Sequence, residues 1–196
     1  MFFKAKPAAP AATPVANAPE PLAAASEAAA KFLPADTLKE RAAQAKHAAA
    51  SIGQLVVMMA AMPAYREHKL SDLNWLVFPA VANGQFSIVD GQSKETGMTA
   101  PLGAVLWAWV SEAVDARLAN TAEPSQRLAP AEWRSGDILW IIETFGDPRL
   151  IGGLVERLRD TIWQGRAPKL RGKGADGQIT VIRLERPAGA AKPPVA

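Results

Sequence analysis

The side chains that most often carry acid–base or nucleophilic chemistry are scarce in this sequence. The chain has two histidines, His47 and His68, and no cysteine. Histidine exchanges protons near neutral pH, so it is the first candidate for a general base. The lack of cysteine excludes disulfides, thiol catalysis and thiolate metal sites, and two histidines so far apart do not predict a zinc or iron centre.

His68 lies in the stretch PAYREHKLSDLNW, which runs from Pro63 to Trp75 and turns from charged to aromatic and apolar. Two interpretations of His68 stay open at this point. It is either a solvated side chain between a glutamate and a lysine, or a base that serves an adjacent site. His47 lies in a polar, alanine-rich stretch and is expected on the surface of a helix.

The middle of the chain has the composition of one globular domain. Of the 196 residues, 49% are hydrophobic, which is enough for a sizeable core. Residues 1–34 and 187–196 are dominated by alanine and proline, so we expect both to be disordered tails. Residues 35–186 then form a single folded domain.

Helical signals come first along this domain. Asp36 or Thr37 is expected to cap a helix that ends before Pro63, and its second half, IGQLVVMMAAM, is apolar nearly all round and is predicted to be buried. Ser71 and Asp72 offer the next cap, before LNWLVFPAVANG. Pro79 is expected to kink or stop that second helix.

The remaining elements alternate between strands and helices. GQFSIVDG, APLGAVLWAWVS and ILWIIETFG are predicted strands, and the last two runs, APKLRGK and GQITVIRLER, are expected to pair as a hairpin. Ser111 opens a short helix, and Asp147 with Pro148 opens another. The inward stripe of this last helix is predicted to be Ile151, Leu154, Leu158 and Ile162. The order indicates an α/β domain, with a mixed sheet of about five strands flanked by helices.

Charge and hydropathy limit the partners. The net charge is only +3, and basic residues do not cluster with aromatic ones, so a nucleic-acid partner is not expected. The stretch RAPKLRGKG is either a solvated loop or edge strand, or a surface for an acidic partner. The start of the chain does not resemble a signal peptide, and QLVVMMAAM is too short to span a bilayer. We therefore expect a cytoplasmic protein with no integral membrane segment.

Several spaced pieces of the sequence resemble one family. They are MPAYR, DLNWLVFPAVANGQFSI, PLGAVLWAWVSEAVDARL and LAPAEWRSGDILWIIETFG, with the amphipathic helix that follows. Together they resemble the toxin-activating lysine acyltransferases, which fatty-acylate RTX protoxins in the bacterial cytoplasm. The resemblance covers residues 50–185. It implies a GNAT-like fold, a fatty acyl chain on acyl carrier protein as donor, an internal lysine of an RTX-type protein as acceptor, no further cofactor and a possible homodimer.

The resemblance also assigns site residues, and both differ from the family pattern. The family's catalytic histidine position is occupied by Tyr65, and its aspartate position, three residues after Trp140, by Glu143. A tyrosine, with an ordinary pKa of about 10, is a proton donor at neutral pH. The base role then falls to Glu143 or to His68, three residues beyond Tyr65. Glu143 is otherwise a strand-end carboxylate that faces solvent.

Two arginines are candidates for the donor's binding site. Arg66 and Arg134 could meet the acidic carrier protein, or could simply be exposed. Three hypotheses follow: a protein-lysine fatty acyltransferase with a rearranged site, a catalytically silent homologue that binds carrier protein or a client, or an unrelated α/β binding module. If the resemblance holds, Glu143 should lie in a cleft beside Tyr65 with a raised pKa, and His68 should be close but not bonded.

Overall fold

The computed structural model describes residues 35–92, 94–122, 127–174 and 177–186. The predicted tails, 1–34 and 187–196, lie outside the described residues. The chain divides into two compact units, residues 1–44 and 45–196. The second unit contains the whole sheet and every residue assigned to the site.

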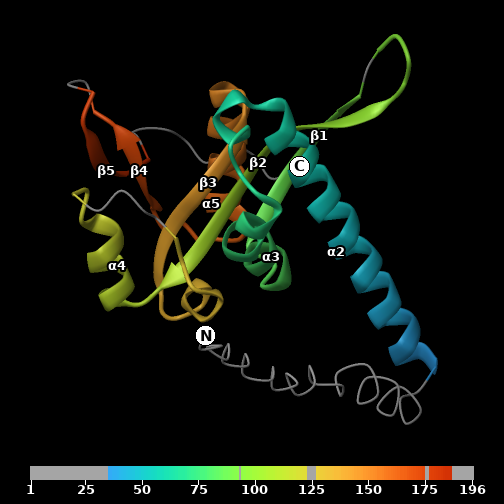
Figure 1. Cartoon of the computed structure of the whole chain (residues 1–196), viewed down its shortest axis with the longest axis horizontal. Coiled ribbons are helices and arrows are strands. Elements are labelled where there is room, and N and C mark those ends of the chain that lie inside the picture. The colour runs from blue at the N-terminus through green and yellow to red at the C-terminus, as the bar shows by residue number, and fades with distance from the viewer. Residues whose placement is uncertain (1–34, 93, 123–126, 175–176, 187–196) are drawn as a thin grey trace, which may run out of the picture. The chain divides into compact units, whose positions relative to one another are not determined.

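The sheet has five strands in the order β1-β2-β3-β4-β5 (Figure 1). Its strands are β1 (Phe86–Gln92), β2 (Thr99–Val110), β3 (Ile138–Gly146), β4 (Lys169–Lys173) and β5 (Ile179–Arg183). All neighbours pair antiparallel except β3 and β4, which are parallel and are joined through a helical crossover. The helices in the described part are α2 (Ala35–Ala61), α3 (Leu73–Ala82), α4 (Glu112–Ala119) and α5 (Pro148–Thr161). The predicted class, a GNAT-like α/β domain with a mixed five-stranded sheet, is confirmed.

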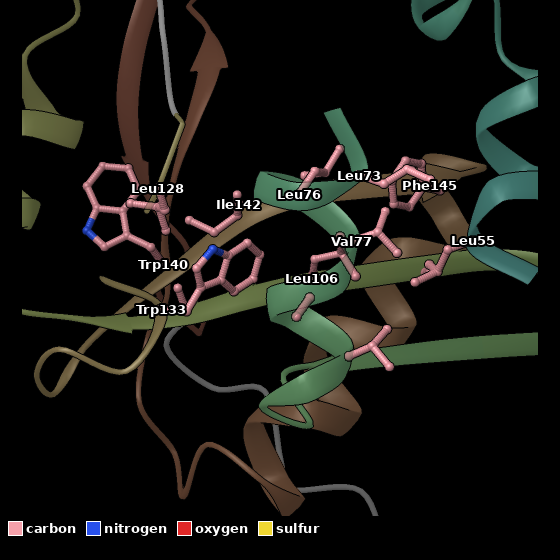
Figure 2. Close-up of a cluster of buried hydrophobic side chains, with 14 of the residues drawn as sticks. Leu55, Leu73, Leu76, Val77, Leu106, Leu128, Trp133, Trp140, Ile142 and Phe145 are labelled. Atoms are coloured by element: carbon pink, nitrogen blue, oxygen red, sulfur yellow. The ribbon is translucent and has the colours of Figure 1, made fainter. Parts of the chain in front are cut away.

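Strands β2 and β3 form the centre of the domain because both of their faces are apolar. On one face, Leu106 and Trp140 pack with α3 and the last turns of α2, and Figure 2 shows the α3 side chains lying over those of β3. On the other face, Trp107 and Leu139 pack with α5. The central strands are thereby covered by helices on both sides.

Strands β3 and β4 are paired at one place only, Trp140 with Lys169. Beyond that pair the two strands separate (Figure 1). The carboxyl-terminal half of β3 therefore has β2 as its only paired neighbour among the described residues. This half of β3 contains Glu143.

Of the two outcomes predicted at Pro79, a kink or a stop, the stop is wrong, because α3 continues through Pro79 to Ala82. A proline in a helix removes one backbone hydrogen bond, which a short helix with a buried apolar surface tolerates. Asn83 closes the last turn, since its backbone N–H (3.0 Å) and its side-chain amide (2.8 Å) both donate to the Pro79 carbonyl.

Two expectations about burial are also wrong. The second half of α2 is not buried all round: Leu55, Met58 and Met59 face the core, whereas Val57 is 62% exposed. Ile162 does not extend the buried stripe of α5 and is 52% exposed, although it keeps helical geometry and its N–H donates to the Leu158 carbonyl (2.9 Å). Trp163, the next residue, is fully buried instead.

Candidate active site

Tyr65 is placed by a sharp change of direction after α2. Pro63 opens a single turn of 3₁₀ helix, Pro63–Tyr65, and this turn carries the tyrosine back toward the sheet. The ring of Tyr65 is half-buried and packs against Phe145 of β3, with 5.4 Å between ring centroids. Tyr65 is thereby held against the same half of β3 that contains Glu143.

Glu143 faces Tyr65 because β3 contains a bulge. Leu106 of β2 pairs with Glu143, but the next residue, Trp107, pairs with Ile141, so Ile142 is an extra residue in β3. Before the bulge, Trp140 and Ile142 face the core that includes α3. After it, the odd-numbered Phe145 faces that core, and so does Glu143, which bonds Tyr65. A regular strand would turn Glu143 to the opposite face, toward α5.

The surroundings of the Glu143 carboxylate alter its proton affinity. Burial raises the pKa of Glu143, while hydrogen bonds from the Thr144 N–H (2.9 Å to Oε1) and from Tyr65 lower it, as does the charge of His68. The burial effect is the larger, so the pKa of Glu143 lies above its usual range. A carboxylate with a raised pKa is a stronger base than an ordinary glutamate.

Tyr65 is the hydrogen-bond donor of the pair. Its own burial, followed by the charge of Glu143 and the hydrogen bond to it, raises the pKa of Tyr65 far above its ordinary value. The phenol therefore stays protonated at neutral pH. This agrees with the expectation that Tyr65 is a donor and leaves Glu143 as the stronger proton acceptor of the two.

His68 lies beside Tyr65 but is exposed. The two rings are 4.9 Å apart between centroids and tilted by 55°. His68 makes no hydrogen bond to Glu143 in the described part of the chain, although its charge lowers the pKa of both Glu143 and Asp72. Asp72 is itself held by the Lys69 N–H (2.9 Å), the Trp75 indole (3.2 Å) and Arg127 (3.1 Å). The imidazole is therefore close to two carboxylates and open to solvent.

A cavity of about 330 Å³ opens next to this cluster. Its polar lining consists of Tyr65, Arg66, His68 and Lys69. Its apolar lining consists of Val56, Met59, Ala60, Leu70 and Leu73. Glu143 does not line the cavity itself and is linked to it through Tyr65, which differs from the expectation that Glu143 would lie in the cleft. The apolar lining was missed from sequence because the second half of α2 was taken to be wholly buried.

The two arginines proposed for the donor lie far apart. Arg66 follows Tyr65 and lines the cavity. Arg134 is bridged to Trp109 just before β3 begins at Ile138. Five residues of strand separate Ile138 from Glu143, which is roughly 15 Å. The structure therefore brings Arg66, but not Arg134, to the site.

A larger cavity, of about 430 Å³, lies at the amino-terminal end of β3 and is lined in part by Ile138, Arg166 and Lys169. We place the candidate site at the smaller cavity because Tyr65, which lines it, bonds a carboxylate with a raised pKa and packs beside His68. Across the described ranges, no three His, Cys, Asp or Glu side chains are grouped so that they could hold a metal ion. None of the helices in those ranges has both the length and the apolar character to cross a membrane.

The fold and the site together define a GNAT-like domain with a half-buried tyrosine–glutamate pair beside a largely apolar cavity. Residues 44–185 match the HlyC family model, described as the RTX toxin acyltransferase family. This match covers well over half of the chain, and the protein belongs to the RTX toxin acyltransferase family. No curated protein matches the chain.

Proposed function

We propose that this protein transfers a fatty acyl chain from acyl carrier protein to an internal lysine of an RTX-type protein. The observation that carries the proposal is the half-buried Glu143 carboxylate, which has a raised pKa and bonds Tyr65. Family membership supports the transfer of an acyl group and an RTX toxin as its target. The carrier protein as donor and the lysine as acceptor belong to the proposal.

The proposed step requires one proton acceptor and one donor. A lysine ammonium loses a proton to become a nucleophile, and its nitrogen then attacks the carbonyl carbon of the thioester. Glu143 accepts that proton, directly or through water. The carbon–sulfur bond breaks, the nitrogen loses a second proton as the amide forms, and the carrier's thiolate leaves and takes up that second proton, while the first is released from Glu143 to solvent. The Tyr65 hydroxyl donates to negative charge, either on Glu143 or on the carbonyl oxygen as it develops.

The charge around the cavity supports a carrier protein as donor. Arg66 and Lys69 are exposed at its rim, next to His68. An acidic carrier protein that docks there would be attracted electrostatically, and the attraction would weaken as salt rises. Arg134 would contact the same carrier protein only if the interface reached the far end of β3.

A second candidate function is a silent homologue that binds carrier protein or client without catalysis. The observation in its favour is Tyr65 itself, since a phenol with a raised pKa cannot replace the family's histidine as a base. This candidate keeps the cavity and its basic rim but gives no product. Both candidates fit a protein that acts in the cytoplasm, alone or as a homodimer.

The test is incubation of the protein with fatty acyl carrier protein and an RTX-type client, followed by intact mass and peptide mapping. We expect the client to gain the mass of one acyl chain on a lysine, and the Glu143→Gln variant to give none. If carrier protein binds but no client is modified by the wild-type protein with any acyl chain, the silent homologue is the correct function.

A further inference from the structure

We infer that the cavity beside Tyr65 holds the acyl chain of the donor, and that the α2 residues in its wall limit the length of chain transferred. The inference rests on the proposed function and adds the location of the chain and the source of its selectivity. It starts from the cavity's lining, which is apolar along α2 and polar where it meets Tyr65 and His68.

The apolar wall is built by one face of a helix. Val56, Met59 and Ala60 are three and four residues apart, so their side chains lie on the same face of α2. Leu70 and Leu73 complete the wall from the segment that enters α3. Leu70 is 82% exposed, so the wall still contains an apolar side chain that an occupant could cover.

The polar end fixes the direction of the chain. Tyr65 lines the cavity and bonds Glu143, so a thioester carbonyl must lie at this end for the acid–base pair to act on it. The chain then runs along α2 toward Val56.

The alternative occupant is the client segment that presents the lysine, and the lining disfavours it. Inside the cavity a lysine ammonium would meet no carboxylate among the lining residues, whose polar members are Tyr65, Arg66, His68 and Lys69. Five apolar side chains also offer no partners to the peptide groups of an extended segment. A hydrocarbon chain needs no charged partner and no hydrogen-bond partner. An acidic carrier protein also matches the basic charge of the rim.

Two neighbouring alanines give a matched test. Ala60 and Ala61 are both exposed and adjacent on α2, but only Ala60 lines the cavity. Ala60→Phe narrows the cavity, while Ala61→Phe adds the same side chain outside it. We expect Ala60→Phe to lower transfer of a palmitoyl chain relative to an octanoyl chain by about tenfold or more, and Ala61→Phe to leave that ratio unchanged.

A second measurement does not depend on turnover. A palmitoyl carrier protein with a photoreactive group at the chain end is crosslinked to the wild-type protein, and the labelled peptide is identified by mass spectrometry. We expect label on the part of α2 that contains Val56 and Met59, and loss of that label in Ala60→Phe but not in Ala61→Phe. Label there without transfer would support the chain site in a silent homologue.

The inference and the proposed function fail in different ways. Transfer that occurs with an unchanged palmitoyl-to-octanoyl ratio in Ala60→Phe, or label that maps away from α2, overturns the inference and leaves the function intact. A raised KM for the client with an unchanged chain ratio assigns the cavity to the acceptor and likewise overturns it. If no transfer is detected and no label is found on α2, both the inference and the proposed function are overturned.

Discussion

The two ends of β3 differ in what their charged groups do. At the amino-terminal end, the basic groups beside the larger cavity have partners: Arg166 donates to the Asp137 backbone carbonyl (2.9 Å), and Lys169 pairs with Asp115 (2.8 Å). At the carboxyl-terminal end, Glu143 is half-buried, and the hydrogen-bond donors on it within the described residues, the Thr144 N–H and Tyr65, are neutral. Charges in ion pairs hold a structure together, whereas a half-buried carboxylate without an ion-pair partner is available for chemistry. The size of a cavity is therefore a poorer guide to the site than whether the charged groups beside it have ion-pair partners.

The sharpest way to test this contrast is to neutralise one acid at each end. Glu143→Gln removes the proposed base and should lower kcat/KM for acyl transfer by at least about a hundredfold, the usual loss for a general base. Glu185→Gln, beside the larger cavity, should leave the rate unchanged. An equal loss in both variants would contradict the placement of the site.

Substitutions of Tyr65 test its role as hydrogen-bond donor at the carboxyl-terminal end of β3. Tyr65→Phe removes one hydrogen bond to a charged group and should lower kcat/KM by about ten- to hundredfold. Tyr65→His restores the family's residue and should raise activity, or create it in a silent protein. His68→Ala should have little effect.

The opposite pattern would reassign the base. If Tyr65→His has no effect while His68→Ala abolishes transfer, then His68 accepts the proton and Glu143 does not. Circular dichroism of each variant shows whether the fold is preserved.

At the other end of β3, substitutions should change stability and not activity. Lys169→Met removes the partner of Asp115, whose side chain is 19% exposed, and should lower the free energy of unfolding by about 1–3 kcal/mol. Arg183→Gln breaks an ion pair whose side chains are both more than 60% exposed, and should change it by about 0.5 kcal/mol or less. Urea unfolding measures both, and a large loss of activity in folded Lys169→Met would contradict the contrast.

The smallest effect concerns pH and stability. Because the pKa of Glu143 is higher in the folded than in the unfolded chain, the folded state binds more protons between the two values. The wild type should therefore lose stability as pH rises from the ordinary glutamate pKa through the raised one. Glu143→Gln does not titrate, so it should gain stability relative to wild type over that range. A gap that is constant with pH would show that the pKa of Glu143 is not raised.

Much of the fold follows from local patterns in the sequence. Apolar runs located β2 and β3, and the caps at Ser111 and Asp147 located α4 and α5. Burial near the ends of helices could not be predicted from the sequence. The exposure of Val57 and Ile162 depends on what packs against them and not on their spacing along the helix. Tertiary packing also outweighed the local effect of Pro79.

The site was predictable only in part. Family resemblance picked out Tyr65 and Glu143, and the structure brings them together. The bulge at Ile142 could not be predicted, since the residues IIETF read as a regular strand and the extra residue is apparent only from the pairing with β2. The apolar cavity needed the relative placement of α2 and the segment that follows it, which no local pattern supplies.

The bulge has a consequence for local opening of β3. Within the described residues, those before the bulge pair with β2 and, at Trp140, with β4, whereas those after it pair with β2 and no other strand. A break in the ladder between two such halves lets the second half open without the first. Backbone amides from Glu143 to Gly146 should thus exchange with deuterium faster than those from Leu139 to Ile141. A bound acyl chain should slow that exchange, which would make the strand that carries the carboxylate a direct reporter of substrate.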